Sequence, residues 1–512
     1  MASSIVAYHS LQIAPFEIRL HEVNLVKSIH DHARLTFTGI IPEEKEDQYV
    51  RMASEQTNVE LVCTEENGNK LTLFHGMLLK LHVKMDKGVY WLEAEAVSHT
   101  YAMDIKLDNQ SFQNKSLLVE DVMKEVSKPY SKAQINNTYN DKLKLGSFTL
   151  QYQETDWQFM KRLASHYNAP LVPISSRNNI SLYVGIPDHK DIGQIKATHY
   201  RVYKDLLAYK NTGDSKQSGI TEKDFICYEV VLDQILELGD QVTFKNQKLH
   251  VFEVHTEMTR GILTHKYILC TKNAGYKRKE YNSKIIGASI QGKVMAVVRD
   301  EVKVKLDYDQ GWSLDTAYLF PYSTMYASDD QTGWYCMPEK GDDVRIYFPG
   351  SKEAEGIALS TVRKKLPSEA SSGASGGGKS SSGSGNVTTT VVKQETLQPI
   401  VHYDQDLKED LMKNPNTKFI LTPAGQKIMF EDDQITIVAS KGGSSITLTN
   451  AGMIILNSNN KISIQTGKQI EMMSESIVMV GDQIEMSTEG GKGGITIDQG
   501  QVIIKGVEIL MK

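Results

Sequence analysis

The stretch that decides the fold is residues 443–464, GSSITLTNAGMIILNSNNKISI. One small unit recurs in it: an apolar residue, a spacer and a second apolar residue, as in Ile446/Leu448, Ile454/Leu456 and Ile462/Ile464. An i, i+2 spacing puts both side chains of such a dyad on one face of a β-strand, and isoleucine favours strands. The pattern therefore predicts short strands separated by polar turns.

The same dyad recurs over roughly the last hundred residues, in steps of 5 to 11 residues. The dyads are Phe419/Leu421, Ile428/Phe430, Ile435/Ile437, Ile446/Leu448, Ile454/Leu456, Ile462/Ile464, Ile470/Met472, Ile477/Met479, Ile484/Met486, Ile495/Ile497, Val502/Ile504 and Val507/Ile509. A step near seven is also typical of a coiled coil. Glycines such as Gly442, Gly452 and Gly467 disfavour that interpretation because they interrupt a continuous helix.

One dyad per turn is too little apolar surface to close a core around a single chain, since a solenoid coil usually needs about 20 residues or more. Three chains close it, each forming one wall of a prism. We therefore predict an intertwined triple-stranded β-helix, a homotrimeric needle, over residues 401–512. Its predicted core is Ile446, Leu448, Ile454, Leu456, Ile462, Ile464, Ile470, Met472, Ile477, Met479, Ile484, Met486, Ile495 and Ile497, and its candidate tip contacts are Val507, Ile509 and Met511.

The composition bounds the rest of the chain. At 512 residues we expect several domains, and a net charge of −6 gives no basic field for nucleic acid. The N-terminal residues lack a basic segment followed by an apolar run, so we expect no signal peptide, no membrane span and synthesis in the cytoplasm. The four cysteines, which are scattered in strand-like contexts without a CxxC pair, are expected to be buried thiols.

Upstream of the needle the chain divides into five parts in a mainly β fold. Residues 1–100 alternate apolar and polar and predict an antiparallel β-barrel, and residues 201–280 predict a second one. Between them, residues 101–200 predict a small α/β insert, with a short helix from Ser116 and a second helix capped by Thr155 and Gln158. Residues 287–363, including a strand at 333–338, predict an OB-like barrel. Residues 364–400 form a linker in which 14 of the 20 residues at 367–386 are Gly or Ser.

No catalytic or metal-binding pattern stands out. His30 and His32 are the closest histidine pair, but no third ligand is evident, so we expect no metal and no cofactor. Glu154, Asp156 and Arg162 form either an ion network at a contact between domains or subunits, or a capped helix start whose acids compensate the helix dipole.

Two motifs resemble those of one family. QYQETDWQFMKRLA at 151–164 is similar to the helix start of VgrG-type spikes and phage late-control proteins. Pro338, Gly341, Asp342, Val344 and Phe348, with the closing Gly356, resemble that family's OB module. The order of barrels, insert, OB module and needle matches over nearly the whole chain.

The resemblance implies the hub and spike of a contractile injection system, which is a phage tail, a tailocin, an extracellular contractile particle or a type VI secretion system. In the family, three chains with two barrels each form a six-fold-like ring on a hexameric tube. The implied partners are two further copies, the inner tube protein, baseplate proteins, a tip-capping protein or effector, and the target-cell envelope, without nucleic acid. The resemblance implies assembly into a tail-like particle and no enzymatic activity.

The sequence departs from some relatives of that family. Only the Gly/Ser-rich linker stands where some relatives carry a peptidoglycan hydrolase. A His-x-His tip motif is missing, since His402 is the last histidine. A spike with hydrolase activity in the 101–200 insert and a trimeric β-solenoid adhesin remain as alternatives.

Overall fold

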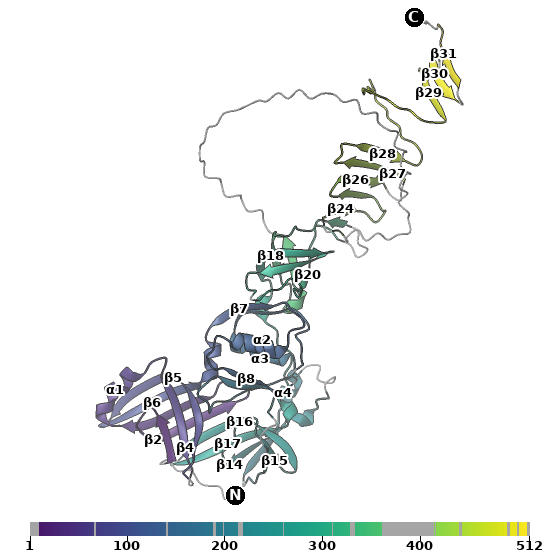
Figure 1. Ribbon diagram of the computed structural model, residues 1–512. Helices are drawn as coiled ribbons and strands as arrows, with labels where there is room; N and C mark the ends of the chain where they lie inside the picture. The colour runs from purple at the N-terminus through teal and green to yellow at the C-terminus, as the bar shows by residue number, and fades with distance from the viewer. Residues whose placement is uncertain are drawn as a thin grey trace, which may run out of the picture.

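The computed structural model describes residues 10–65, 68–139, 142–187, 191–197, 199–212, 219–259, 261–309, 311–327, 333–360, 414, 416–439, 443–488, 492–498 and 501–508. The predicted mainly β fold is confirmed in these residues. Figure 1 shows an elongated chain in which a broad N-terminal part, a smaller barrel and a thin C-terminal part follow one another. We call these parts the hub, the collar and the shaft. The predicted linker and the candidate tip residues Ile509 and Met511 lie outside the described residues.

The hub is built on one continuous sheet of 12 described strands. Its first half comprises β1 (Leu11–Ala14), β2 (Arg19–Ser28), β3 (Arg34–Ile41), β4 (Asn58–Thr64), β5 (Lys70–Asp86) and β6 (Val89–Ser98). Its second half comprises β12 (Asp191–Gln194), β13 (Tyr200–Lys204), β14 (Ile226–Leu232), β15 (Gln241–Phe244), β16 (Gln247–Thr259) and β17 (Ile262–Cys270). The halves join where β2 pairs with β16 in antiparallel register.

Each half of the hub sheet encloses its own apolar core. Alternate side chains of the first half point inward, such as Val59, Leu61 and Cys63 of β4, and a core forms from them. Helix α1 (Glu46–Met52) adds Tyr49 to this core, whereas α4 (Leu206–Asn211) in the second half buries none of its residues. The second half has a separate core around Tyr267 and Leu249. Two such cores in one sheet fit a tandem of similar units.

The insert packs two helices against short strands. Its elements are α2 (Val119–Ser127), α3 (Asp156–Ser165), β7 (Leu107–Phe112), β8 (Gln134–Asn137), β9 (Thr149–Thr155), β10 (Leu171–Pro173) and β11 (Ser181–Val184), with the 3₁₀ turn η3 (His99–Asp104). The predicted capping box is confirmed, because the Thr155 side chain accepts from the Gln158 amide and the Gln158 side chain bonds to the Thr155 amide. This box starts α3 directly after β9, so the end of the strand and the start of the helix are fixed together.

The collar is a five-stranded antiparallel sheet in the order β20-β19-β18-β22-β23. Its strands are β18 (Ser289–Val298), β19 (Glu301–Leu306), β20 (Leu319–Pro321), β22 (Asp343–Tyr347) and β23 (Ile357–Ser360), and the 3₁₀ turn η8 (Glu353–Glu355) precedes β23. The strand predicted for this barrel at 333–338 is shorter and lies elsewhere. It is β21 (Gly333–Tyr335), which pairs with the first strand of the shaft.

The shaft begins with a meander whose strands pair in sequence order after β21. They are β24 (Lys418–Leu421), β25 (Lys427–Phe430), β26 (Gln434–Ala439), β27 (Ser444–Thr449) and β28 (Ile454–Ser458). Beyond a stretch without assigned strands, β29 (Gln483–Ser487), β30 (Gly494–Asp498) and β31 (Gln501–Lys505) form a second antiparallel sheet. None of the described helices has the length and hydropathy needed to cross a membrane.

Candidate functional site: the two collar junctions and the apolar rows of the shaft

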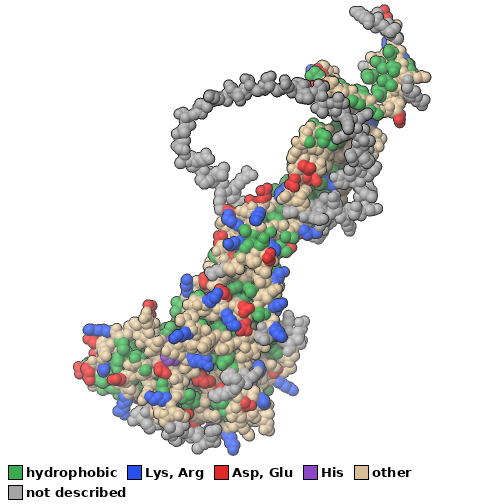
Figure 2. Space-filling view, viewed as in Figure 1, with side chains coloured by type: hydrophobic (Ala, Val, Ile, Leu, Met, Phe, Trp, Pro, Cys, Tyr) green, Lys and Arg blue, Asp and Glu red, His purple; other side chains and the backbone are tan. Residues whose placement is uncertain are grey.

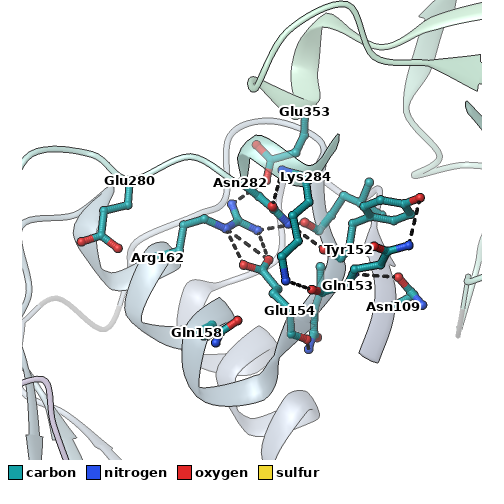
Figure 3. A network of polar contacts seen from close by, with 12 residues as sticks. Asn109, Tyr152, Gln153, Glu154, Gln158, Arg162, Glu280, Asn282, Lys284 and Glu353 are labelled. Carbon is teal, nitrogen blue, oxygen red and sulfur yellow. Dashed lines mark hydrogen bonds and ion pairs between the residues drawn. The ribbon is translucent and has the colours of Figure 1, made fainter. Parts of the chain in front are cut away.

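A buried ion network joins the hub insert to the collar (Figure 3). Arg162 of α3 donates from Nε and Nη2 to the Glu154 carboxylate at 2.6–3.2 Å. Its Nη1 donates to Oε1 of Glu353 in η8 at 2.6 Å, and its Nη2 also donates to the Leu150 carbonyl at 2.8 Å. The network that the sequence suggested at this helix is therefore a contact between domains, and its collar partner is Glu353.

The three charged side chains of this network are almost fully removed from water. Their side chains are 4%, 6% and 7% exposed for Arg162, Glu154 and Glu353. Burial raises the pKa of Glu154, and the neighbouring guanidinium opposes that rise. Burial disfavours the charged form of Arg162, but the two carboxylates outweigh it and hold the pKa of Arg162 above its usual value. The guanidinium is therefore held as a cation between two acids, one from each domain.

A second polar contact crosses the same junction. Asp309 of the collar accepts from the Ser111 hydroxyl and, at 2.7 Å, from the Gln113 side-chain amide. That amide also donates to the Val304 carbonyl at 2.8 Å, while the Gln113 side-chain oxygen accepts from the Tyr318 amide at 3.1 Å. Ser111 and Gln113 of the insert are thus hydrogen-bonded to strands or loops of the collar.

The collar core is shared by three parts of the chain. Phe148 and Leu150 of the insert, and Phe419 and Met429 of the shaft, lie in the same buried cluster as the collar residues around Phe320. The rings of Phe148 and Phe320 meet edge to face with centroids 5.1 Å apart. Insert, collar and shaft therefore share one core.

The collar–shaft junction is a direct strand pairing. Gly333, Trp334 and Tyr335 of β21 oppose Leu421, Ile420 and Phe419 of β24. The rings of Tyr335 and Phe419 stack with centroids 4.9 Å apart, and Lys418 Nζ donates to the Met337 carbonyl at 2.9 Å. The shaft is therefore bonded to the collar through residues on either side of the 361–413 segment, which is not described.

The opposite face of the shaft meander carries two rows of apolar side chains. Cross-strand partners place Ile420, Ile428, Ile437, Ile446 and Leu456 in one row. The second row contains Phe430, Ile435, Leu448 and Ile454. Directly opposed side chains on one face pack against each other, so the rows form a continuous apolar stripe. The dyad Phe419/Leu421 is an exception, because Phe419 lies in the collar core and Leu421 packs against it.

The predicted core residues of the needle lie on exposed surface in the single chain. Ile446 and Leu448 are in β27, Ile454 and Leu456 in β28, Ile484 and Met486 in β29, and Ile495 and Ile497 in β30. Ile462, Ile464, Ile470, Met472, Ile477 and Met479 lie between the two sheets. Except for the half-buried Ile484, these residues are 38–72% exposed. Figure 2 shows hydrophobic side chains gathered over the terminal sheet, and the tip candidate Val507 is also exposed.

Between the two shaft sheets the chain has no assigned strand. Residues 461–482 are described, yet no strand pairing is assigned to them within the chain. Their three dyads keep the same i, i+2 spacing as the paired strands on either side. Backbone amides and carbonyls in an extended segment require hydrogen-bond partners from water or from another chain.

Other candidate residues from the sequence serve structural roles. Asp156 does not join the Arg162 network; it accepts from Tyr130 Oη at 2.6 Å and from the Gln151 amide at 2.8 Å. His32 Nδ1 lies 2.8 Å from Thr100 Oγ1, and in the described part of the chain no group of three metal-ligating side chains is found. The cysteines are free; Cys63, Cys227 and Cys270 are buried as predicted, whereas Cys336 is exposed, contrary to the prediction.

Sequence reasoning missed the collar partners at both junctions. Glu353 lies 191 residues from Arg162, and Asp309 lies 196 residues from Gln113, so no local pattern connects them. Trp334 was placed in the collar, although its strand belongs to the shaft sheet. The alternation of Gly333, Trp334 and Tyr335 indicated a strand, but it did not indicate which strand pairs with it.

Comparison with known proteins finds one family model that matches part of the chain. Residues 47–169 match the model of the phage tail baseplate hub (GPD) family. This match confirms the predicted resemblance to a hub-spike protein of a contractile injection system. No curated protein matches the chain in sequence.

Several solved structures are similar in part. The Escherichia coli c3393 protein, described as a component of the type VI secretion system, is 10% identical, with a TM-score of 0.48 over 68% of this chain and 99% of that one. A tail protein from Neisseria meningitidis MC58 is 12% identical, with a TM-score of 0.41 over 53% and 99% of the chains. A chain of the Francisella PdpA–VgrG complex is 10% identical, with a TM-score of 0.45 over 88% of each.

Proposed function

We propose that three copies of this protein form the hub and spike of a contractile injection machine. In this proposal the hub seats on the inner tube and meets the baseplate, and the shaft points toward the target envelope. The three shafts wind together and puncture the envelope mechanically when the surrounding machine contracts. The tube protein, baseplate proteins, and a capping protein or effector at the tip are its proposed partners.

The observation that carries this proposal is the pair of apolar rows on the shaft. Leaving such a stripe in water is unfavourable, at about 25 cal/mol for each Å² of apolar surface. In the part of the chain that the structure describes, no second layer covers the rows of the meander, while three copies related by a threefold axis cover one another's rows. The 461–482 segment supports the same arrangement, because neighbouring chains supply its backbone partners. A shaft of this kind is stiff, since it peels only if bonds between chains break.

A passive role is supported by the engagement of the two acids that a hydrolase in the insert would use. Glu154 and Asp156 are each 5% exposed. Glu154 is bound by Arg162, and Asp156 by Tyr130 and Gln151. A general acid or base must reach the proton that it transfers, and these two carboxylates face protein partners instead of a cleft. We therefore propose that the spike works without catalysis.

The test is the mass of the full-length protein in native buffer, measured by light scattering. The expected mass is about three times the 57.4 kDa of one chain. Ile446→Asp introduces a charge into the proposed core, so it is expected to reduce trimer formation strongly. Thr447→Asp is the matched control, since Thr447 is half-buried on the other face of the same strand and lies outside the apolar rows.

Four results would contradict the proposal. A wild-type mass of one chain excludes the trimer. Equal loss of trimer in the Ile446 and Thr447 variants excludes the apolar rows as its core. Hydrolysis of purified peptidoglycan by the protein, abolished by Glu154→Gln, would favour the hydrolase alternative. Specific binding of glycans by the shaft would favour the adhesin.

A further inference from the structure

The apolar row of the shaft does not begin in the shaft. Trp334 of β21 directly opposes Ile420 of β24, and Ile420 opposes Ile428, the next member of the row. Trp334 therefore lies on the same face as the row, one strand nearer the hub, and 41% of it remains exposed. Its neighbour Tyr335 points the other way into the collar core.

The collar holds β21 rigidly in this orientation. Tyr335 Oη donates to the Arg299 carbonyl at 2.6 Å, and the Trp334 amide donates to the Tyr326 carbonyl at 2.9 Å. Gly333 has φ +132°, and a Cβ there would meet the Tyr326 carbonyl oxygen at 2.3 Å. Glycine alone fits that position without a clash, and the backbone of β21 leaves Trp334 on the face away from the collar core.

We propose that Trp334 from each of three copies forms the first layer of the shared core, so that the interface between copies starts in the collar. This inference rests on the proposed trimer and adds a residue and a place to it. The occupant of the exposed Trp334 face is the other two copies, because the row that Trp334 begins continues without interruption through β24, β25, β26, β27 and β28. An indole buries a larger apolar surface than isoleucine, which suits the base of the prism.

The layer also fixes how the shaft is set on the collar. Rows of isoleucine and leucine are similar from strand to strand, so they specify register weakly. A layer of indoles at one end is unlike the layers above it, and a shift of one strand between copies would place an indole against an aliphatic side chain of the Trp334 row. Trp334 is therefore a positioning residue for the trimer in addition to a source of buried area.

The experiment compares the fluorescence of full-length wild type with that of Trp334→Phe at matched trimer concentration. The difference between the two spectra is the emission of Trp334, and acrylamide reports its accessibility. In the trimer we expect blue-shifted emission and quenching several-fold weaker than for a free indole. Trp91→Phe in the hub is the control, because it removes a different tryptophan and should leave the protected component unchanged.

Light scattering on the same samples separates the outcomes. A trimer with protected Trp334 supports the inference. A trimer in which acrylamide quenches Trp334 like a free indole overturns it but leaves the proposed function standing, and a monomer overturns both. In addition, Trp334→Ala should lower the temperature at which the trimer dissociates, whereas the dissociation temperature of Trp334→Phe should lie close to that of the wild type. If Trp334→Ala and Trp334→Phe dissociate at the wild-type temperature, the layer does not stabilise the trimer.

Discussion

Removing the Arg162 side-chain charge should destabilise the junction between hub and collar more than the loss of an exposed ion pair destabilises its own surroundings. Arg162→Met keeps much of the aliphatic length but leaves Glu154 and Glu353 buried without their cation. Breaking a buried ion pair by removing one partner costs about 3–5 kcal/mol. Since about 1.4 kcal/mol corresponds to a factor of ten, the local opening equilibrium should shift by roughly 10²-fold to 10³-fold or more.

Hydrogen exchange is the suitable assay, because a multidomain chain does not unfold in one step and exchange reports local opening. The amides of α3 and β9 should lose protection by that factor. Arg51→Met is the matched control: Arg51 pairs with Asp47 at 3.2 Å, but the two side chains are 80% and 84% exposed. An exposed i, i+4 pair contributes about 0.3–0.5 kcal/mol, so protection near it should change only about twofold.

A rescue variant separates the lost charge from lost packing. Glu154→Gln together with Glu353→Gln in the Arg162→Met chain removes both unpaired charges, so part of the protection should return. Protection in Arg162→Met that equals the wild type, or that falls no further than in Arg51→Met, would refute the conclusion that this network holds the two domains together. A fall that the double glutamine change does not reverse would assign the effect to packing.

Two other predictions follow from the junctions and the buried histidines. Cleavage at a protease site placed within residues 361–413 should not release the shaft, because β24 stays paired with β21 and Phe419 stays in the collar core. The two pieces should co-elute in gel filtration, and their separation would contradict this prediction. Burial lowers the pKa of His30 to about 3 and of His265 to about 4, so the folded state excludes protons that the unfolded state binds below pH 6.5. As the pH is lowered from 6.5 to 4, the free energy of unfolding of the hub should therefore fall by about 1.4 kcal/mol per pH unit for each histidine. If the His265→Gln protein shows the same pH slope as the wild type, this prediction is wrong.

The local pattern predicted what depends on local geometry. The dyads predicted strands because i, i+2 spacing fixes the face of a side chain whatever the strand pairs with, and the described strands β24 to β31 follow them. The dyads Ile462/Ile464, Ile470/Met472 and Ile477/Met479 are the exception, because no strand is assigned at 461–482 within the chain. The capping box at Thr155 is equally local, since its two hydrogen bonds span three residues. Where a strand is assigned, the dyads and the capping box were predicted correctly for the same reason, because both depend on local geometry.

Pairing partners across long separations could not be predicted in the same way. The strand at Gly333–Tyr335 has the alternation of a collar strand and of a shaft strand alike, and only the fold shows that it pairs with β24. Glu353 gave no signal either, because acids in a turn before a short strand are usually solvated. Phe419 was counted among the needle dyads on spacing alone, and the fold turns that residue to the collar core instead.

The two junctions define how an axial load passes through one chain. A force on the shaft reaches β21 through its hydrogen bonds with β24, and it enters the collar core through Phe419 and Met429. Phe148 and Leu150 lie in that same core, so the load passes to the insert without crossing a flexible hinge. Arg162 and the Asp309 contacts resist sliding at this step, because hydrogen bonds are directional whereas apolar contacts are not. Continuous packing from shaft to insert is what the proposed passive spike requires, and in the described part of the chain it makes the strength of the collar core the property that limits the load.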